Sequence, residues 1–196
     1  SPRSLLISLE RLLPLASGVR LMRLFGNGKF AMNHDALIYA CVFLALWSAI
    51  IAGVFSAFSE FIMSALVRAN PTSCIESMQQ INITVLKTQF VAGVLLIPLL
   101  SIGLAVYAWD MLSGWTRIGI ALAPLVFVLA VFLITLLANV PMNERLARMT
   151  PDSPDAHTYW RRYGIVWTRL KHERVLCSVV TTEIYLIVAI TLAQGP

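Results

Sequence analysis

The chain has 196 residues, of which 58% are hydrophobic and only 13% are charged. A water-soluble domain of this length has too little interior to bury so much apolar surface, so the composition excludes an ordinary soluble protein and predicts a membrane protein. The formal charge of +5 would suit nucleic acid. The basic residues flank apolar segments, however, so we expect membrane lipids as the counterpart and no nucleic-acid binding.

Residues 1–35 are expected to form a separate N-terminal arm. Between Ser4 and Phe25, leucines and other apolar residues recur at helical spacing, with three arginines among them. This pattern is typical of an amphipathic helix that lies in the membrane interface, kinked or begun afresh at Pro14. We interpret the arm as a surface anchor, and a targeting remnant or a docking arm for a partner are the alternatives.

Residues 36–196 are expected to form the membrane domain, because four apolar runs are long enough to cross a bilayer as helices. These runs are 36–63, 90–109, 118–138 and 175–193. None shows the two-residue alternation of a membrane β-strand, so the sequence predicts an all-α fold, a four-helix transmembrane bundle with an N-terminal interfacial amphipathic helix. Trp109 and Trp115 bracket a polar turn and predict a tight hairpin, whereas Pro141 is expected to end the third helix.

Charge outside the spans bears on location and orientation. The connection between the third and fourth runs carries the most basic residues. This favours placing that connection on the cytoplasmic or matrix side. We expect a multi-pass protein of a bacterial inner membrane or a mitochondrial inner membrane.

Two carboxylates fall inside the predicted spans. Glu183 lies near the middle of the fourth span, where a charge costs at least about 2.5–3.5 kcal/mol, so such a residue normally faces protein or water. A proton relay, a lock within the bundle and a subunit contact all suit this position. Glu60 lies near the end of the first span and is expected to pair with Arg68 or with the basic third-to-fourth connection.

Polar and aromatic residues concentrate in two stretches that are expected on the same side of the membrane. The first contains Phe58 and Asn82, and the second runs from 139 to 174. In the second stretch Trp160, Tyr163 and Trp167 form one helical stripe, which suits either an interfacial aromatic belt or the wall of a pocket for a flat ring system. The two stretches are candidates to converge on one pocket.

Four motifs in these stretches resemble the anthrone-oxygenase-like family of small four-helix membrane proteins. In chain order they are AGVFSAFSEFIMSAL, MQQIN, NVPMNERL and W-x-x-Y-x-x-x-WT-x-x-x-H-x-R. The resemblance covers nearly all of the chain outside the arm and implies the four-helix membrane fold. It also implies oxidation of phenolic polycycles such as anthrones without metal or flavin. We therefore expect no cofactor, and no cysteine or histidine spacing suggests a metal.

Oxygenation without a cofactor requires a base that makes an electron-rich carbanion, and a dry aromatic pocket in which that anion meets dioxygen. His172 is the predicted base, because its ordinary titration lies nearest neutrality. Arg174, or alternatively Arg169, is expected to stabilise the developing enolate oxygen. The predicted catalytic residues are His172, Arg174 and Asn143. The predicted substrate-binding residues are Phe58, Asn82, Asn139, Trp160, Tyr163 and Trp167.

Two further hypotheses stay open beside a cofactor-free oxygenase of lipophilic phenols. One is a non-catalytic subunit of a larger membrane complex, such as a respiratory complex, contacting its partners through the arm and Glu183. The other is a small transporter or channel, which is disfavoured because the sequence lacks the internal repeat and the interrupted helix pairs of secondary transporters. Whether the protein is an enzyme is left open by the sequence.

Overall fold

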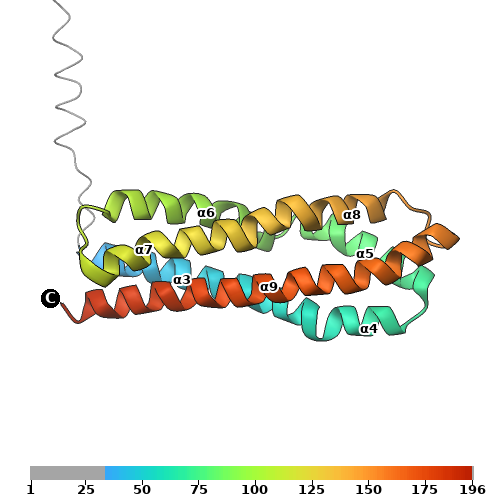
Figure 1. Cartoon of the computed structure of the whole chain (residues 1–196), viewed down its shortest axis with the longest axis horizontal. Helices are drawn as coiled ribbons and strands as arrows, with labels where there is room; N and C mark the ends of the chain where they lie inside the picture. The colour runs from blue at the N-terminus through green and yellow to red at the C-terminus, as the bar shows by residue number, and fades with distance from the viewer. Residues whose placement is uncertain (1–33, 196) are drawn as a thin grey trace, which may run out of the picture. The chain divides into compact units, whose positions relative to one another are not determined.

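The computed structural model describes residues 34–195, and these residues are almost entirely helical (Figure 1). Four helices are long and apolar enough to cross a membrane, namely His34–Arg68, Gln89–Ala108, Gly114–Ala147 and Pro154–Ala193. The predicted all-α membrane bundle is confirmed, and the protein is a multi-pass membrane protein. The predicted N-terminal arm falls almost wholly outside the described residues, so the division at residue 35 stays a prediction.

Two of the long helices contain π-helical turns. The first consists of α3 (His34–Ala57), η2 (Phe58–Ile62) and α4 (Met63–Arg68). The third consists of α7 (Gly114–Phe127), η3 (Val128–Phe132), η4 (Thr135–Asn139) and α8 (Val140–Ala147). The remaining helices are α5 (Pro71–Val85), α6 (Gln89–Ala108) and α9 (Pro154–Ala193).

Local sequence explains where α5 and α9 begin. Asn70 caps α5, because its side chain accepts hydrogen bonds from the backbone N–H groups of Thr72 and Ser73. Ser153 caps α9 in the same way through the N–H of Ala156. Each cap is followed by a proline in the first turn, where the missing N–H costs nothing.

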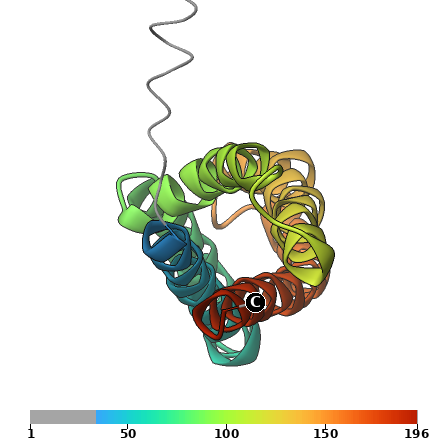
Figure 2. The same ribbon diagram turned by 90° about the vertical axis from the view of Figure 1, so that its left-hand side faces the viewer.

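The four long helices form a ring. α3 packs against α6 and α9, and α7 packs against the same two helices. Figure 2 shows this square arrangement end-on. Large apolar side chains cover the outer surface, with Leu99, Leu137 and Ile187 each more than 60% exposed. Such an outer surface is stable in lipid and not in water.

The helices differ in length, and this divides the bundle into two layers. α6 has 20 residues and rises about 30 Å, which matches the hydrocarbon core. α9 has 40 residues and rises about 60 Å. Its N-terminal half therefore projects beyond the membrane with α4, α5 and α8, at the right-hand end of Figure 1. We call this part the extension.

Pro141 does not end the third helix, and that prediction is wrong. The helix continues through α8 to Ala147. Proline removes one backbone hydrogen bond and clashes with the carbonyl four residues earlier, which belongs here to Leu137. Leu137 lies inside η4, where the wider π-helical turn relieves this crowding.

Candidate functional site

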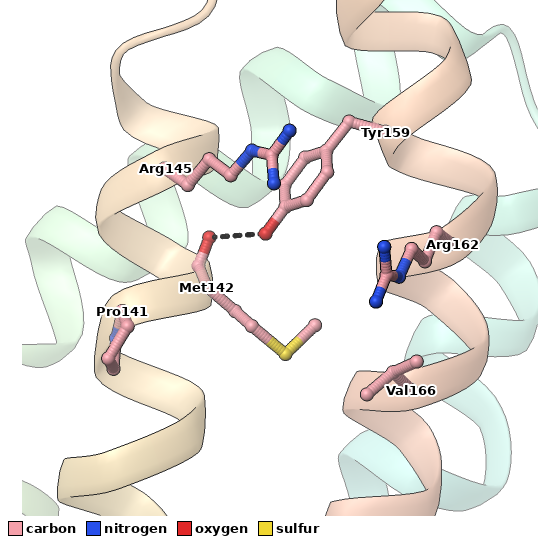
Figure 3. A pocket seen from close by; sticks show the side chains of 6 residues that line it. All are labelled: Pro141, Met142, Arg145, Tyr159, Arg162 and Val166. Carbon is pink, nitrogen blue, oxygen red and sulfur yellow. Dashed lines mark hydrogen bonds between the residues drawn. The ribbon is translucent and has the colours of Figure 1, made fainter.

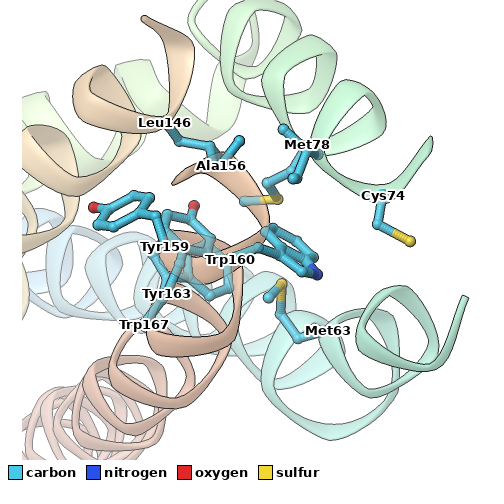
Figure 4. Packing of buried hydrophobic residues seen from close by; sticks show 10 residues of the cluster. Met63, Cys74, Met78, Leu146, Ala156, Tyr159, Trp160, Tyr163 and Trp167 are labelled. Atoms are coloured by element: carbon cyan, nitrogen blue, oxygen red, sulfur yellow. The ribbon is translucent and has the colours of Figure 1, made fainter. Parts of the chain in front are cut away.

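An aromatic stripe on α9 fills the interior of the extension (Figure 4). The stripe comprises Tyr159, Trp160, Tyr163 and Trp167. Tyr163 stacks on Trp160 and on Trp167, with ring centroids 5.5 and 5.8 Å apart. All four side chains are buried against α4, α5 and α8, so the stripe is an internal packing surface and not an interfacial belt.

Asn143 of α8 organises two of these rings. Its side-chain oxygen accepts a hydrogen bond of 2.7 Å from the Tyr163 hydroxyl and one of 3.1 Å from Nε1 of Trp167. Asn82 of α5 also interacts with the Tyr163 side chain. The structure thus brings together four of the predicted site residues from three helices.

Lys171 lies one turn beyond Trp167, in the interior of the bundle. Its side chain is only 6% exposed. Nζ lies 4.3 Å from the ring centroid of Trp167, 4.4 Å from that of Phe55 and 5.0 Å from that of Phe58. Aromatic faces attract cations through their quadrupole, so the three rings favour the charged form of this amine.

Arg174 is the second buried cation, with 1% of its side chain exposed. Its guanidinium carbon lies 4.4 Å from the Phe55 ring centroid, so Lys171 and Arg174 contact the same ring. Nη1 donates to the hydroxyl of Thr135 over 3.2 Å, and Nε donates to the carbonyl of Leu170. Nη2 is buried and has no hydrogen-bond partner among the described residues.

Asn139 adds two more unpaired polar atoms. It lies one helical turn after Thr135, at the end of η4, and is 3% exposed. Neither its amide nitrogen nor its amide oxygen makes a hydrogen bond within residues 34–195. Buried polar atoms in proteins normally have partners, so this side chain is free to bind a polar group brought in from outside the described chain. We call Phe55, Phe58, Thr135, Trp167, Lys171 and Arg174 the cation cluster, and Asn139 follows Thr135 by one turn of the same helix.

Among the described residues no carboxylate balances the charge of the cation cluster. The ion pair found within residues 34–195 joins Glu144 and Arg148 on the exposed side of α8, away from these cations. Buried charges are costly unless they are paired, and aromatic rings supply only part of the stabilisation that an anion would supply. The cation cluster is therefore suited to an anionic oxygen.

The cation cluster lies at the boundary between membrane and extension. Phe55 packs edge-on against Phe90, with ring centroids 5.3 Å apart. Phe90 belongs to the first turn of α6, whose length matches the hydrocarbon core. Lys171 and Arg174 contact Phe55 and so lie near this level.

A match to a known family covers the segment that contains Lys171 and Arg174. The sequence profile of anthrone oxygenase matches residues 85–183, about half of the chain. The chain belongs to the anthrone oxygenase family. Neither the curated proteins nor the solved structures contain a match to this family member. The matched segment includes Asn139, Asn143, Lys171 and Arg174, whereas Phe55 precedes it.

Not all predicted site residues of this anthrone oxygenase family member meet at the cation cluster. Arg174, Phe58 and Trp167 belong to it, and Asn82, Asn143 and Tyr163 adjoin it through Trp167 and its neighbours. Asn139 lies one turn after Thr135 on the third helix. Trp160 lies further along the stripe, stacked on Tyr163. His172 and Arg169 are exposed on the outer side of α9. The role of His172 as the base therefore stays a prediction without support from its position.

The two predicted intramembrane acids also lie on the outer surface. Glu60 accepts a hydrogen bond from the Ser56 hydroxyl one turn earlier, and its predicted ion pair with Arg68 is not formed in the described part of the chain. Glu183 is exposed on the membrane half of α9. A lock within the bundle is therefore not its role.

Sequence reasoning did not include Lys171, Phe55 or Thr135 among the site residues. A signal for Lys171 was present, because it continues the aromatic stripe at a spacing of four residues from Trp167. Phe55 lies within the first family motif. Thr135 carried no signal, because a threonine in an apolar run commonly bonds its own helix, as this one also does to Val131.

Cys74 is a poor candidate for a nucleophile, and the described residues offer no three-ligand metal site. Cys74 of α5 is buried, and burial raises the pKa of its thiol, so the nucleophilic thiolate is disfavoured. Among the described residues no group of three His, Cys, Asp or Glu side chains could hold a metal ion.

Proposed function

We propose that the protein binds a flat, lipophilic phenol or enol as its anion at the cation cluster, and that it oxidises an anthrone-like substrate with dioxygen. One observation carries the proposal. Lys171 and Arg174 are buried side by side against aromatic rings, and within the described chain neither has a carboxylate partner. Membership of the anthrone oxygenase family supports the choice of substrate class.

The cation cluster favours ionisation of such a substrate. Arg174 offers the unpaired N–H groups of Nη2, and Lys171 offers an ammonium group, to one oxygen anion. Fixed positive groups in a site with little water stabilise a negative oxygen much more than water does, so the substrate binds as its anion and gives up its proton to bulk water. Phe58 and Trp167, with ring centroids 5.7 Å apart, supply apolar surface for the flat rings.

Oxidation then requires only the bound anion and dioxygen. The anthrone anion is electron-rich at the carbon opposite its oxygen. It transfers one electron to dioxygen, and the two radicals combine at that carbon to form a hydroperoxide after uptake of a proton. Loss of water gives the quinone. One oxygen atom stays in the product and the other leaves in water, together with the two hydrogens of the reacting carbon. The unpaired amide group of Asn139 supports a role for this residue in orienting a second oxygen of the substrate.

Activity of the purified full-length protein in detergent tests the proposal. Anthrone is supplied, and oxygen consumption and quinone formation are followed together. Loss of one charged donor at an oxyanion typically lowers the rate by about 10²-fold or more, so we expect that of Lys171→Met and Arg174→Met. Arg169→Gln removes an exposed charge from the same helix and is expected to retain activity.

The variant His172→Ala separates the two assignments. If His172→Ala abolishes quinone formation while Lys171→Met and Arg174→Met do not, the base predicted from the sequence is right and the cation cluster is not the catalytic site. Full activity in both cation variants would overturn the proposed mechanism.

Binding is measured independently of turnover with alizarin, a dihydroxyanthraquinone dye whose visible absorption moves to longer wavelength on ionisation. We expect the wild-type protein to bind the ionised dye at a pH where free alizarin is largely neutral. Lys171→Met and Arg174→Met should remove this spectral shift. A shift of equal size in both variants would show that the anion is held elsewhere.

A second candidate function is that of an accessory subunit in a larger membrane complex. Glu183 favours it, because a carboxyl group exposed to lipid near the middle of a span is costly and a partner helix with a polar or basic residue would relieve that cost. Stoichiometric co-purification with a large complex in mild detergent would support this function. Migration as a small species that oxidises anthrone would exclude it as the main role.

A further inference from the structure

A pocket separate from the cation cluster opens between α8 and α9, on the outer surface of the extension (Figure 3). Its volume is about 260 Å³. It is lined by Pro141, Met142, Arg145, Tyr159, Arg162 and Val166. We propose that this pocket binds the phosphate of an anionic phospholipid. The proposal does not rest on the oxygenase function.

Tyr159 holds the pocket in shape. Its hydroxyl donates a hydrogen bond of 3.2 Å to the carbonyl oxygen of Met142, which ties α9 to α8. The guanidinium carbon of Arg145 lies 4.4 Å from the centroid of the Tyr159 ring. Stacking on this buried ring orients the guanidinium group, so less conformational freedom is lost when an anion binds.

Two arginines from facing helices converge on this pocket. Arg145 comes from α8 and Arg162 from α9, and both guanidinium groups interact electrostatically with the Tyr159 side chain (Figure 3). Arginine is the side chain best suited to phosphate, because its planar N–H groups bind two oxygens at once. The pocket therefore offers two such groups to one anion.

In the described part of the chain no carboxylate competes for these arginines. None of the residues that line the pocket is acidic, and neither arginine forms an ion pair within residues 34–195. The neighbouring Arg148 differs, since it pairs with Glu144 over 3.6 Å. Arg161 also differs, because it donates to the Thr158 hydroxyl. Arg148 and Arg161 therefore have polar partners that the two arginines of the pocket lack within residues 34–195.

The depth of the pocket matches the phospholipid headgroups. Lys171 lies near the membrane boundary, and Val166 and Arg162 precede it on α9 by five and nine residues. A helix rises about 1.5 Å per residue, so the pocket lies about 7–14 Å outside the hydrocarbon core. The headgroup layer begins at this boundary, and long arginine side chains reach back toward it.

An apolar path leads from the pocket into the bilayer. Leu137 precedes Pro141 by four residues on the third helix and is 74% exposed. Leu170 follows Val166 by four residues on α9. Positions four apart lie on the same face of a helix, so both leucines continue the pocket toward the membrane. A phospholipid can therefore place its phosphate between the arginines and its acyl chains along this path, which a free phosphate cannot use.

Native mass spectrometry of the full-length protein tests the proposal. The delipidated protein is titrated with phosphatidylglycerol, with phosphatidylcholine and with inorganic phosphate. The double variant Arg145→Gln, Arg162→Gln is compared with the control Arg161→Gln, Arg169→Gln, which loses the same charge from exposed positions outside the pocket. We expect the pocket variant to bind phosphatidylglycerol at least about tenfold more weakly, and the control to change less than threefold.

A second measurement locates the lipid. Phosphatidylglycerol with a photoreactive acyl chain is expected to label peptides that contain residues 136–142 and 159–170 in the wild-type protein, and to label them much less in the pocket variant. Gel filtration and circular dichroism confirm that both variants are folded. Equal loss of binding in the control, binding of phosphatidylcholine as tight as that of phosphatidylglycerol, or inorganic phosphate that binds as tightly as the lipid would each overturn the proposal.

Discussion

Replacement of Asn143 by leucine is expected to destabilise the extension. The side-chain oxygen of Asn143 accepts from Tyr163 and from Trp167, and both donors are buried. Leucine has the same branching and the same number of side-chain heavy atoms but no acceptor. The Trp167 N–H is then left unsatisfied, whereas the Tyr163 hydroxyl still has Asn82 beside it.

The magnitude follows from these two donors. A buried donor left without a partner costs about 1–3 kcal/mol, and one hydrogen bond exchanged for a weaker partner costs about 0.5–1.5 kcal/mol. The free energy of unfolding should therefore fall by about 2–4 kcal/mol. Unfolding of the purified protein in mixed micelles, followed by tryptophan fluorescence as denaturing detergent is added, measures this loss.

Two controls isolate the hydrogen bonds from other effects of substitution. Asn143→Asp keeps an acceptor for both donors and should retain most of the stability. Glu144→Gln changes the adjacent exposed residue and should cost less than about 0.5 kcal/mol. If Asn143→Leu is as stable as these controls, Asn143 does not organise the stripe and the reasoning is refuted.

Two other predictions concern the membrane half of the bundle. A Cβ at Gly119 would lie 2.6 Å from Cγ2 of Val188, so Gly119→Ala should force α7 from α9 and lower the free energy of unfolding by about 1–3 kcal/mol. Gly103→Ala meets nothing within 4 Å and should raise it by about 0.5–1 kcal/mol, and equal effects of both variants in the same unfolding assay would contradict the packing argument. Glu183→Leu should improve the free energy of membrane insertion by about 2.5–3.5 kcal/mol if the residue faces lipid. The same variant should abolish co-purification with any partner that Glu183 binds. A variant that alters neither insertion nor assembly would show that the carboxyl group is already paired.

The sequence alone was sufficient for the membrane fold. Hydropathy is a sum over neighbouring residues and needs no tertiary information, so the four spans were predictable, and the hairpin between Trp109 and Trp115 forms where the turn residues lie. The family motifs could also be read from the sequence, because they are local runs of residues, and the family match over residues 85–183 covers the last two of the four. The aromatic stripe of α9 was predicted as a stripe, although its surroundings were not.

Only the tertiary structure decided which faces of these helices are buried. The segment before residue 175 is too polar to be recognised as part of a span. It nevertheless forms the N-terminal half of α9, because α4, α5 and α8 cover its aromatic side. His172 and Lys171 are adjacent in sequence, and a rotation of about 100° per residue places one outside and the other inside the ring of helices. Periodicity shows that two faces exist, but which of them meets lipid, water or protein depends on the neighbouring helices, and the π-helical turns shift that assignment further.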